Sequence, residues 1–273
     1  PMFEELGWNR GGKQLDLFTI PSDDFRFFYG QVKAAVPLNA DGLRFAASAS
    51  RGVQLQRLEG PNQHGKSCQL IADLAYPFVK SRAFSMVGHA SLADWKSQEK
   101  RAGMVIQRDR FQVARGWVEF NRPATTRIDG RLGISQGLDL GSATQRGDPL
   151  ASRPFGSSKF TKFNADVQVA VPIARQLQLR LDSAAQFSTR SLLAAEEFAL
   201  GGSRIGRAYD FNSATGDSGI GGMLELSYRI GDVKGGPKAL ELFTYADGGG
   251  AFRKRPSPGL PKERWLAGTG AGA

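Results

Sequence analysis

Residues that carry redox and metal chemistry are nearly absent from this sequence. Cys68 is the only cysteine among 273 residues, so the chain cannot form an internal disulfide, although this says almost nothing about its compartment. His64 and His89 are the only histidines, and neither lies at a spacing typical of metal ligands. They offer no Ser-His-Asp arrangement, and Cys68 has only His64 as a nearby histidine. We therefore expect no catalytic residues, no metal site and no cofactor, and hence no enzyme.

Long apolar runs are also missing. No stretch of 18 or more apolar residues occurs, and the mean hydropathy is -0.31, so the sequence excludes a membrane-spanning helix. It does not exclude a membrane-spanning β-barrel, because the lipid-facing residues of such strands alternate with polar ones and dilute the hydropathy.

The start of the chain, PMFEELGWNR, lacks an initiator Met and the basic and apolar segments of a secretory signal. We therefore expect an internal fragment. No low-complexity linker and no repeat longer than a hairpin divides the chain, so one domain over residues 1–273 is expected.

The net charge is +10 and the isoelectric point is near 9.9, which raises nucleic acid or an anionic membrane surface as a partner. The Lys and Arg residues, however, are scattered singly and do not cluster with aromatic residues on one element. We expect solvated or lumenal charge and no nucleic-acid partner.

Alternation of apolar and polar residues is the main structural signal. In RQLQLRLDSAAQF, which begins at Arg175, one face carries Leu177, Leu179, Leu181, Ala185 and Phe187, and the other carries Gln176, Gln178, Arg180, Asp182 and Gln186. FNADVQVAV from Phe163 and RIDGRLGIS from Arg127 divide in the same way. Segments of about 10 residues with this pattern are typical of tilted membrane strands. The polar faces are too charged for the core of a soluble protein.

Weaker alternation extends the count to about twelve strands. The additional segments are 13–20, 31–38, 43–50, 68–76, 82–94, 111–120, 223–230, 240–247 and the residues from 265 onward. Short turns, four of them with a proline, alternate with long segments rich in Gly, Ser and Arg at 51–65, 137–158, 190–216 and 248–262. Long loops at one end and short turns at the other are typical of an outer-membrane barrel. A soluble β-sandwich is the minor alternative.

One motif indicates a different class of protein. GPNQHGKS, at residues 60–67, fits the phosphate-binding loop of nucleotide hydrolases, in which Lys66 would neutralise phosphates. That mechanism needs a strand, a loop and a helix in this order, and the chain has almost no long amphipathic helices. We expect a chance match. The glycine-rich AGTGAGA at 267–273 predicts a strand, not a nucleotide loop.

Several acidic residues could form the carboxylate pair of a glycosidase: Asp210, Asp217, Asp247, Glu225 and Glu241. The more economical interpretation is that they are acids facing a polar channel.

Three stretches resemble one family. EEFALGGSRIGRAYDFNSATGDSGIGGMLELSYR (196–229), YPFVKSR (76–82) and LFTYADGGG (242–250) are similar to segments of two-partner secretion transporters, the haemolysin secretion/activation protein family of the outer-membrane assembly-factor superfamily. The sequence departs from the motif at Ala208, where glycine is usual, and at Ile205-Gly206, where a plain valine is usual. Ala208 bears on the tightness of the turn, because only glycine adopts positive φ freely.

The resemblance implies an all-β fold, an antiparallel transmembrane barrel of sixteen strands, of which this chain would supply about strands three to fourteen. The periplasmic POTRA domains, the plug helix and the terminal strands would be missing. It also implies that the loop before the strand at 223–230 folds back into the lumen. The matching loop residues are Gly206, Arg207, Ala208, Tyr209, Asp210, Gly216 and Asp217, and the lumenal partner of Arg207 would be Asp247.

The function implied by the resemblance is an outer-membrane pore of a Gram-negative bacterium. Its partners would be an unfolded exoprotein of the adhesin or haemolysin type and the outer-membrane lipid and lipopolysaccharide. An insertase of the same superfamily is the alternative, because it shares the loop motif. The number of POTRA domains would distinguish them, with two in secretion transporters and five in the main assembly factor.

Overall fold

A computed structural model describes residues 4–22, 26–56, 62–230, 240–257 and 259–273. Its strands are β1 (Glu4–Arg10), β2 (Lys13–Pro21), β3 (Phe27–Pro37), β4 (Arg44–Gln56), β5 (Gln63–Lys80), β6 (Ser85–Arg101), β7 (Met104–Pro123), β8 (Arg127–Leu138), β9 (Thr161–Ala174), β10 (Leu177–Ser188), β11 (Phe198–Leu200), β12 (Ala214–Gly216), β13 (Ser218–Ile230), β14 (Leu240–Phe252) and β15 (Glu263–Gly272). A single 3-10 turn, η1 (Ala194–Glu196), is the one helical element among the described residues. In this part of the chain no helix is long and apolar enough to cross a membrane.

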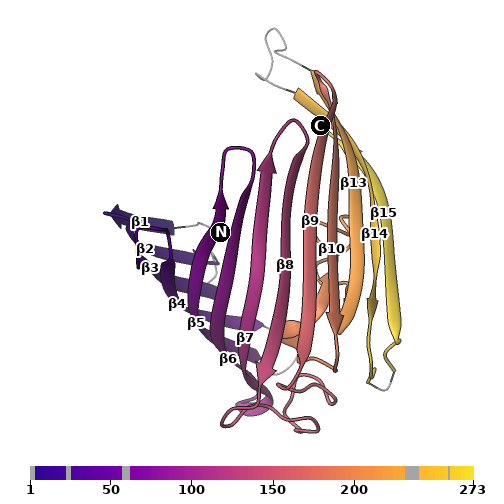
Figure 1. Cartoon of the computed structure of the whole chain (residues 1–273). Helices are drawn as coiled ribbons and strands as arrows, with labels where there is room; N and C mark the ends of the chain where they lie inside the picture. Colours follow the sequence, from indigo (N-terminus) through magenta and orange to yellow (C-terminus); the bar gives the residue numbers. More distant parts are fainter. Residues whose placement is uncertain (1–3, 23–25, 57–61, 231–239, 258) are drawn as a thin grey trace.

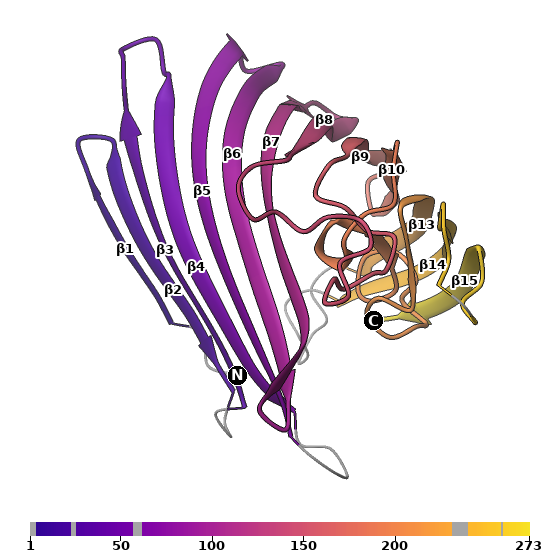
Figure 2. The same cartoon turned by 90° about the horizontal axis from the view of Figure 1, so that it is seen from below.

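The strands form an antiparallel meander. Thirteen of them make one sheet in the order β1-β2-β3-β4-β5-β6-β7-β8-β9-β10-β13-β14-β15, and β11 and β12 form a separate hairpin inserted between β10 and β13. The sheet curls strongly, and within the described residues β1 and β15 are its two edges (Figures 1 and 2). The predicted all-β antiparallel fold of the barrel type is confirmed.

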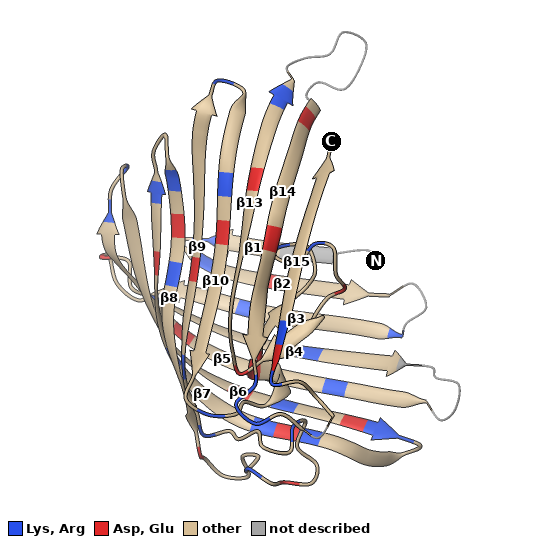
Figure 3. Cartoon of the chain, turned by 90° about the vertical axis from the view of Figure 1, so that its right-hand side faces the viewer, with Lys and Arg blue, Asp and Glu red and all other residues tan. Residues whose placement is uncertain are grey.

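The two faces of the sheet have opposite chemistry, as the alternation predicted. On β10 the inward-facing Asp182 has no exposed surface, whereas the outward-facing Phe187 is 56% exposed. Other large apolar side chains on the convex face are similarly open, including Leu132 and Ile220. Polar side chains are buried inside and apolar ones exposed outside, which is the reverse of a soluble protein and fits a sheet surrounded by lipid. Figure 3 shows charged residues of both signs distributed along the strands.

All twelve predicted strands are present, whereas β1 and the two three-residue strands β11 and β12 were missed. Most strands are longer than predicted. β5 and β7 contain 18 and 20 residues, so the strand at 68–76 begins at Gln63 and the strand at 111–120 begins at Met104. The predicted loop at 51–65 is wrong in most of its described part, because β4 continues to Gln56 and β5 starts at Gln63. Likewise β14 continues through the predicted loop residues 248–252.

The long connections nevertheless gather at one end of the sheet. The connections β8–β9, β10–β13 and β14–β15 lie there, together with a tight turn at Ala102-Gly103 between β6 and β7. The turns β3–β4, β5–β6, β7–β8 and β9–β10 lie at the opposite end (Figure 1). We call these the long-loop end and the short-turn end.

The phosphate-loop interpretation of residues 60–67 is wrong where the structure describes them. Gln63 to Ser67 are paired residues of β5, in register with residues of β4 and β6, and the strand continues to Lys80 without a helix. A continuous ladder uses the backbone N–H groups that would otherwise surround a phosphate.

Candidate functional site

The segment between β10 and β13, residues 189–217, folds onto the concave face of the sheet, as expected. Figures 1 and 2 place it inside the curl of β8 to β15. Its hairpin β11–β12, in which Gly216 is paired with Phe198, supplies apolar side chains to a buried cluster with the wall. That cluster consists of Phe198, Leu200, Ile205, Ala214, Met223, Ala251 and Leu266. We call residues 189–217 the inner loop.

Asp247 binds the backbone of the inner loop at a bend around Gly206. Its Oδ2 atom accepts hydrogen bonds from the N–H groups of Gly206 and Arg207, both at 2.8 Å. Gly206 has φ +87°, a conformation that favours glycine, and a Cβ there would lie 2.9 Å from the backbone N of Gly201. The bend therefore presents two N–H groups to one carboxylate, and hydrogen bonds to an ionised acceptor are stronger than neutral ones.

The guanidinium of Arg207 binds a different carboxylate from the one predicted. Arg207 Nη1 lies 2.6 Å from Glu225 Oε2, and its guanidinium carbon lies 4.7 Å from the centre of the Tyr245 ring. Glu225 and Tyr245 are opposite each other on β13 and β14, on the same face as Asp247. The predicted Arg207–Asp247 side-chain pair is thus corrected. Asp247 already accepts the two backbone N–H groups, and the side chain of Arg207 extends across Tyr245 to Glu225.

The next motif residues lie beside the edge strand. The hydroxyl of Tyr209 donates a 2.9 Å hydrogen bond to the carbonyl oxygen of Ala267 on β15. Ala208 is not among the described non-glycine residues with positive φ, so alanine is compatible with this turn. The side chain of Asp210 is exposed, and its carbonyl oxygen accepts a hydrogen bond from the N–H of Ser213.

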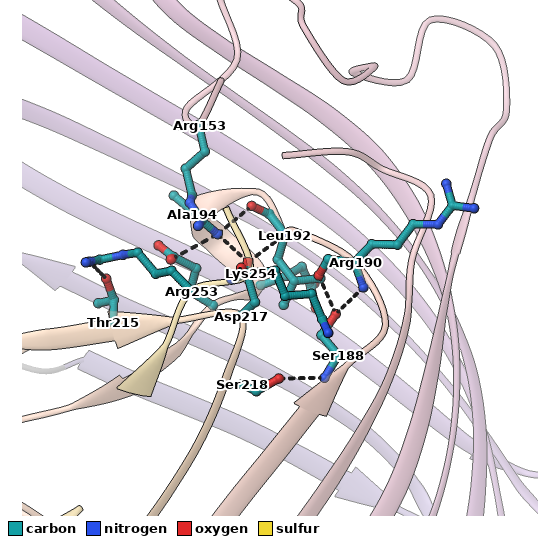
Figure 4. Close-up of polar contacts among 12 residues, drawn as sticks. Arg153, Ser188, Arg190, Leu192, Ala194, Thr215, Asp217, Ser218, Arg253 and Lys254 are labelled. Atoms are coloured by element: carbon teal, nitrogen blue, oxygen red, sulfur yellow. Dashed lines mark hydrogen bonds and ion pairs between the residues drawn. The ribbon is translucent and has the colours of Figure 1, made fainter. Parts of the chain in front are cut away.

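Asp217 is a second buried carboxylate and ties three segments together (Figure 4). It has no exposed surface. Its Oδ1 accepts hydrogen bonds from Arg153 Nη1 at 2.5 Å and Leu192 N at 2.7 Å, and its Oδ2 accepts one from Lys254 N at 2.8 Å. Arg153 Nη1 also lies 3.0 Å from Glu197 Oε1. Burial raises the pKa of Glu197, and the charge of Arg153 opposes that shift.

Sequence reasoning missed the contacts that hold the start of the inner loop. Glu196, on η1, is buried, and its carboxylate pairs with Arg115 of β7 and with Lys162 Nζ of β9, the latter at 2.7 Å. Lys162 Nζ also donates to the carbonyl oxygen of Glu196 at 3.1 Å. The only signal in the sequence is that Arg115 and Lys162 are cations at inward positions of alternating strands.

The site consists of ion pairs and hydrogen bonds. Its described acidic side chains do not form a metal-binding group. Among the described residues, no group of three or more His, Cys, Asp or Glu side chains could hold a metal ion. Of the acids considered for a glycosidase-type pair, Glu225 is paired with Arg207 and Glu241 lies 3.6 Å from Arg229. The remaining buried ones, Asp217 and Asp247, accept backbone N–H groups. This arrangement holds a loop against a wall.

Comparison with known proteins identifies a family and solved structures with a similar fold. The model of the haemolysin secretion/activation protein ShlB/FhaC/HecB family matches residues 30–273. CdiB from Acinetobacter baumannii is 17% identical with a TM-score of 0.69, over 97% of this chain and 48% of that one. BamA from Haemophilus ducreyi lacking POTRA domains 1-3 is 11% identical with a TM-score of 0.65, over 94% of this chain and 57% of that one. The chain therefore spans about half the length of each of these structures. No curated protein sequence matches it.

Proposed function

The chain belongs to the haemolysin secretion/activation protein ShlB/FhaC/HecB family, and we therefore propose that it forms the pore of a two-partner secretion system. It is an outer-membrane β-barrel protein of a Gram-negative bacterium, as its family and its fold indicate. In this proposal its substrate is an unfolded exoprotein of the adhesin or haemolysin type, and the chain performs no chemistry of its own.

The proposed barrel includes strands beyond this sheet. Within the described residues, the two edges at β1 and β15 pair with no further strand, and a membrane protein must satisfy such edges by closing its sheet. CdiB is about twice as long as the region that it shares with this chain. We propose that additional strands close the barrel and that POTRA domains on the periplasmic side recognise the substrate.

The inner wall is suited to passage of an unfolded chain. Its inward positions include Arg127, Asp129, Arg131, Asp166, Gln178, Arg180 and Asp182. Several of these charges are already paired with one another: Arg127 Nε lies 2.7 Å from Asp129 Oδ2, and Arg180 Nη2 lies 2.7 Å from Asp182 Oδ2. A wall of paired charges offers a passing peptide no large apolar surface to adhere to. Folding of the substrate outside the cell would supply the free energy, without a nucleotide.

The observation that carries the proposal is the attachment of the inner loop to the wall. Asp247 binds its backbone, Glu225 binds the Arg207 side chain, and an apolar cluster packs the hairpin β11–β12 against the wall. A loop held in the lumen by specific polar contacts can control the path through the pore. We propose that the docked loop is required for secretion.

The test is secretion by Arg207→Ala in the full-length protein with its native exoprotein. We expect a sharp loss of secreted substrate, while the variant remains in the outer membrane as a heat-modifiable barrel. Arg204→Ala is the matched control, because Arg204 lies in the same loop but pairs with Asp166 at a half-exposed site. Normal secretion by Arg207→Ala, or equal loss in both variants, would refute the role of this contact.

The insertase alternative makes a different prediction. If the protein assembles other outer-membrane proteins, its depletion should lower the amounts of many barrels. A secretion pore should affect only its own exoprotein. Quantitative comparison of the outer-membrane proteins in depleted and normal cells therefore separates the two functions.

A further inference from the structure

We propose that a cluster of cations on the convex face of β4 to β7 binds the phosphates of a glycolipid in the outer leaflet, the lipid A part of lipopolysaccharide. The cluster consists of Arg51, Lys66, Lys96, Arg108 and Arg110, and we call it the basic cluster. This lipid-binding proposal rests on the proposed function only through the orientation, in which the long-loop end faces the cell exterior.

Strand register brings these residues together. Arg51 is opposite Cys68, Cys68 is opposite Lys96, and Lys96 is opposite Arg110, so one row crosses four strands. The next row toward the long-loop end contains Lys66, Gln98 and Arg108 in the same way. All of them point to the same face as the exposed Leu70 and Leu92, because side chains two residues apart share a face. Figure 3 shows basic residues on each of the neighbouring strands β4 to β7.

The basic cluster lines a hollow of about 520 Å³ and carries excess positive charge. Arg51, Lys66 and Arg108 are exposed, and within the part of the chain that the structure describes none of the three forms an ion pair. The other two cations share Asp94, whose carboxylate lies 3.1 Å from Lys96 Nζ and 4.0 Å from Arg110 Nε.

The other acidic residues at the hollow have partners of their own. Asp109 is buried and accepts a hydrogen bond from the N–H of Ser152, and Asp148 accepts one from the N–H of Leu150. Hydroxyl groups of the β8–β9 connection complete the lining, with Ser142 Oγ 2.5 Å from Arg110 Nη1. Three unpaired cations around a hollow with hydroxyl groups are suited to a phosphate group.

An apolar hollow adjoins the basic cluster on the same face. Its volume is about 550 Å³, and its lining includes Ala47, Ala49, Leu70, Ala72 and Leu92. Asp94 belongs to this lining and pairs with cations of the basic cluster, so the two hollows are neighbours. Small side chains between larger ones leave a depression that hydrocarbon can fill. A ligand that satisfies both hollows has an anionic head and acyl chains.

The position along the strand agrees with a headgroup. On β5 the outward aromatic residues Tyr76 and Phe78 lie at the short-turn end, and Cys68 is ten residues from Phe78. At a rise of about 3.3 Å per residue and a tilt of about 40°, ten residues advance about 25 Å along the membrane normal, which is the height of the apolar band of such barrels. The basic cluster therefore begins at the border of the hydrocarbon that lies on the side of the long-loop end.

Lipid A is the occupant that fits these features. A cation costs about 2–4 kcal/mol at the bilayer midplane but little at the interface, so the basic cluster is compatible with headgroup depth only. With the long-loop end outside, that depth belongs to the outer leaflet, whose phosphorylated lipid in this membrane is lipopolysaccharide. Phospholipid phosphates share the chemistry but lie in the inner leaflet, at the short-turn end.

The test measures binding of lipid A to the purified full-length protein in neutral detergent by native mass spectrometry. We expect the double variant Lys66→Gln/Arg108→Gln to bind diphosphorylated lipid A at least about tenfold more weakly than the wild type, because two charge-assisted contacts are lost. Arg82→Gln/Arg122→Gln is the matched control, since it also removes two positive charges, but at the short-turn end. It should bind as the wild type does.

Three further measurements on the wild type keep the proposal falsifiable if the double variant does not fold. Dephosphorylated lipid A and phosphatidylglycerol should bind more weakly than diphosphorylated lipid A, and added salt should weaken the binding of diphosphorylated lipid A more than that of dephosphorylated lipid A. Equal binding of dephosphorylated lipid A would leave only the apolar hollow and would overturn the phosphate site. Equal binding of phosphatidylglycerol, or an unchanged double variant, would also overturn it. Secretion is measured separately, so a failed pore function and a failed lipid site give different results.

Discussion

Double-mutant cycles can separate the energetic contributions of the two carboxylates that hold the inner loop, because the two carboxylates contact different parts of Arg207. The Glu225 carboxylate contacts the guanidinium, whereas the Asp247 carboxylate contacts only the backbone N–H. The first cycle combines Arg207→Ala with Glu225→Gln, and the second combines Arg207→Ala with Asp247→Asn. In each cycle the coupling energy is the part of the two effects that is not additive.

The structure gives the expected magnitudes. A hydrogen bond to a charged group contributes about 1.5–3 kcal/mol. The side chains of Arg207 and Glu225 are 21% and 14% exposed, so solvent screens part of this interaction. We expect a coupling of about 1–2 kcal/mol in the first cycle and less than about 0.5 kcal/mol in the second. Asp247→Asn alone should still destabilise the docked loop, because two hydrogen bonds lose their charged acceptor.

The assay is hydrogen exchange of the inner loop in the full-length protein. The amides of Gly201, Gly202 and Tyr209 bond to carbonyl groups within the loop and should exchange only when the loop opens. A coupling of 1–2 kcal/mol changes the open population by a factor of about 5–30. Amides of β6 and β7, which do not contact Arg207, serve as the internal control. Equal coupling in the two cycles would refute the assignment of Glu225 as the partner of the guanidinium.

Two further predictions concern the bend and the faces of the sheet. Gly206→Ala should destabilise the docked loop by about 1–3 kcal/mol, because of its positive φ and the close backbone of Gly201, whereas Ala208→Gly should be tolerated; the same exchange assay checks both, and equal effects would contradict the geometry. Leu179→Arg, on the lipid face of β10, should destabilise the barrel by about 2–4 kcal/mol near the midplane, whereas the inward Gln178→Arg should not. Unfolding in urea followed by heat modifiability measures this difference, and similar midpoints for the two variants would show that the faces are reversed.

The strands could be predicted from the sequence because hydrocarbon and water impose a period of two on every segment that separates them. That pattern fades where a strand leaves the membrane, so the sequence predicts a loop for the first residues of β5 from Gln63, although their backbone ladder continues. β1 was missed for a related reason. Its seven residues, EELGWNR, contain only two large apolar side chains at alternating positions, which is too short a pattern to indicate a strand.

The site was predicted at the level of the loop and not at the level of its contacts. The resemblance of residues 196–229 to the family implied that this segment folds inward, and Asp247 contacts it through the N–H of Gly206. Two inward acids on adjacent strands, Glu225 and Asp247, differ in position along the wall by two residues, or about 7 Å. An arginine side chain can span that distance, so the sequence is compatible with either acid, and the three-dimensional structure identifies Glu225 as the partner of the guanidinium.

The basic cluster can be recognised only from the three-dimensional structure, because its residues are far apart in the sequence. In the sequence Arg51, Lys66, Lys96 and Arg110 are isolated, and their scatter predicts solvated or lumenal charge and no nucleic-acid partner. Antiparallel register places them on adjacent strands in two neighbouring rows, so residues scattered along the chain form a patch on the surface. Because outward cations are costly inside hydrocarbon and nearly free at its border, the height of the patch also marks where the membrane ends. The same residues that would hold a phosphate thus help to set the depth of the barrel in the bilayer.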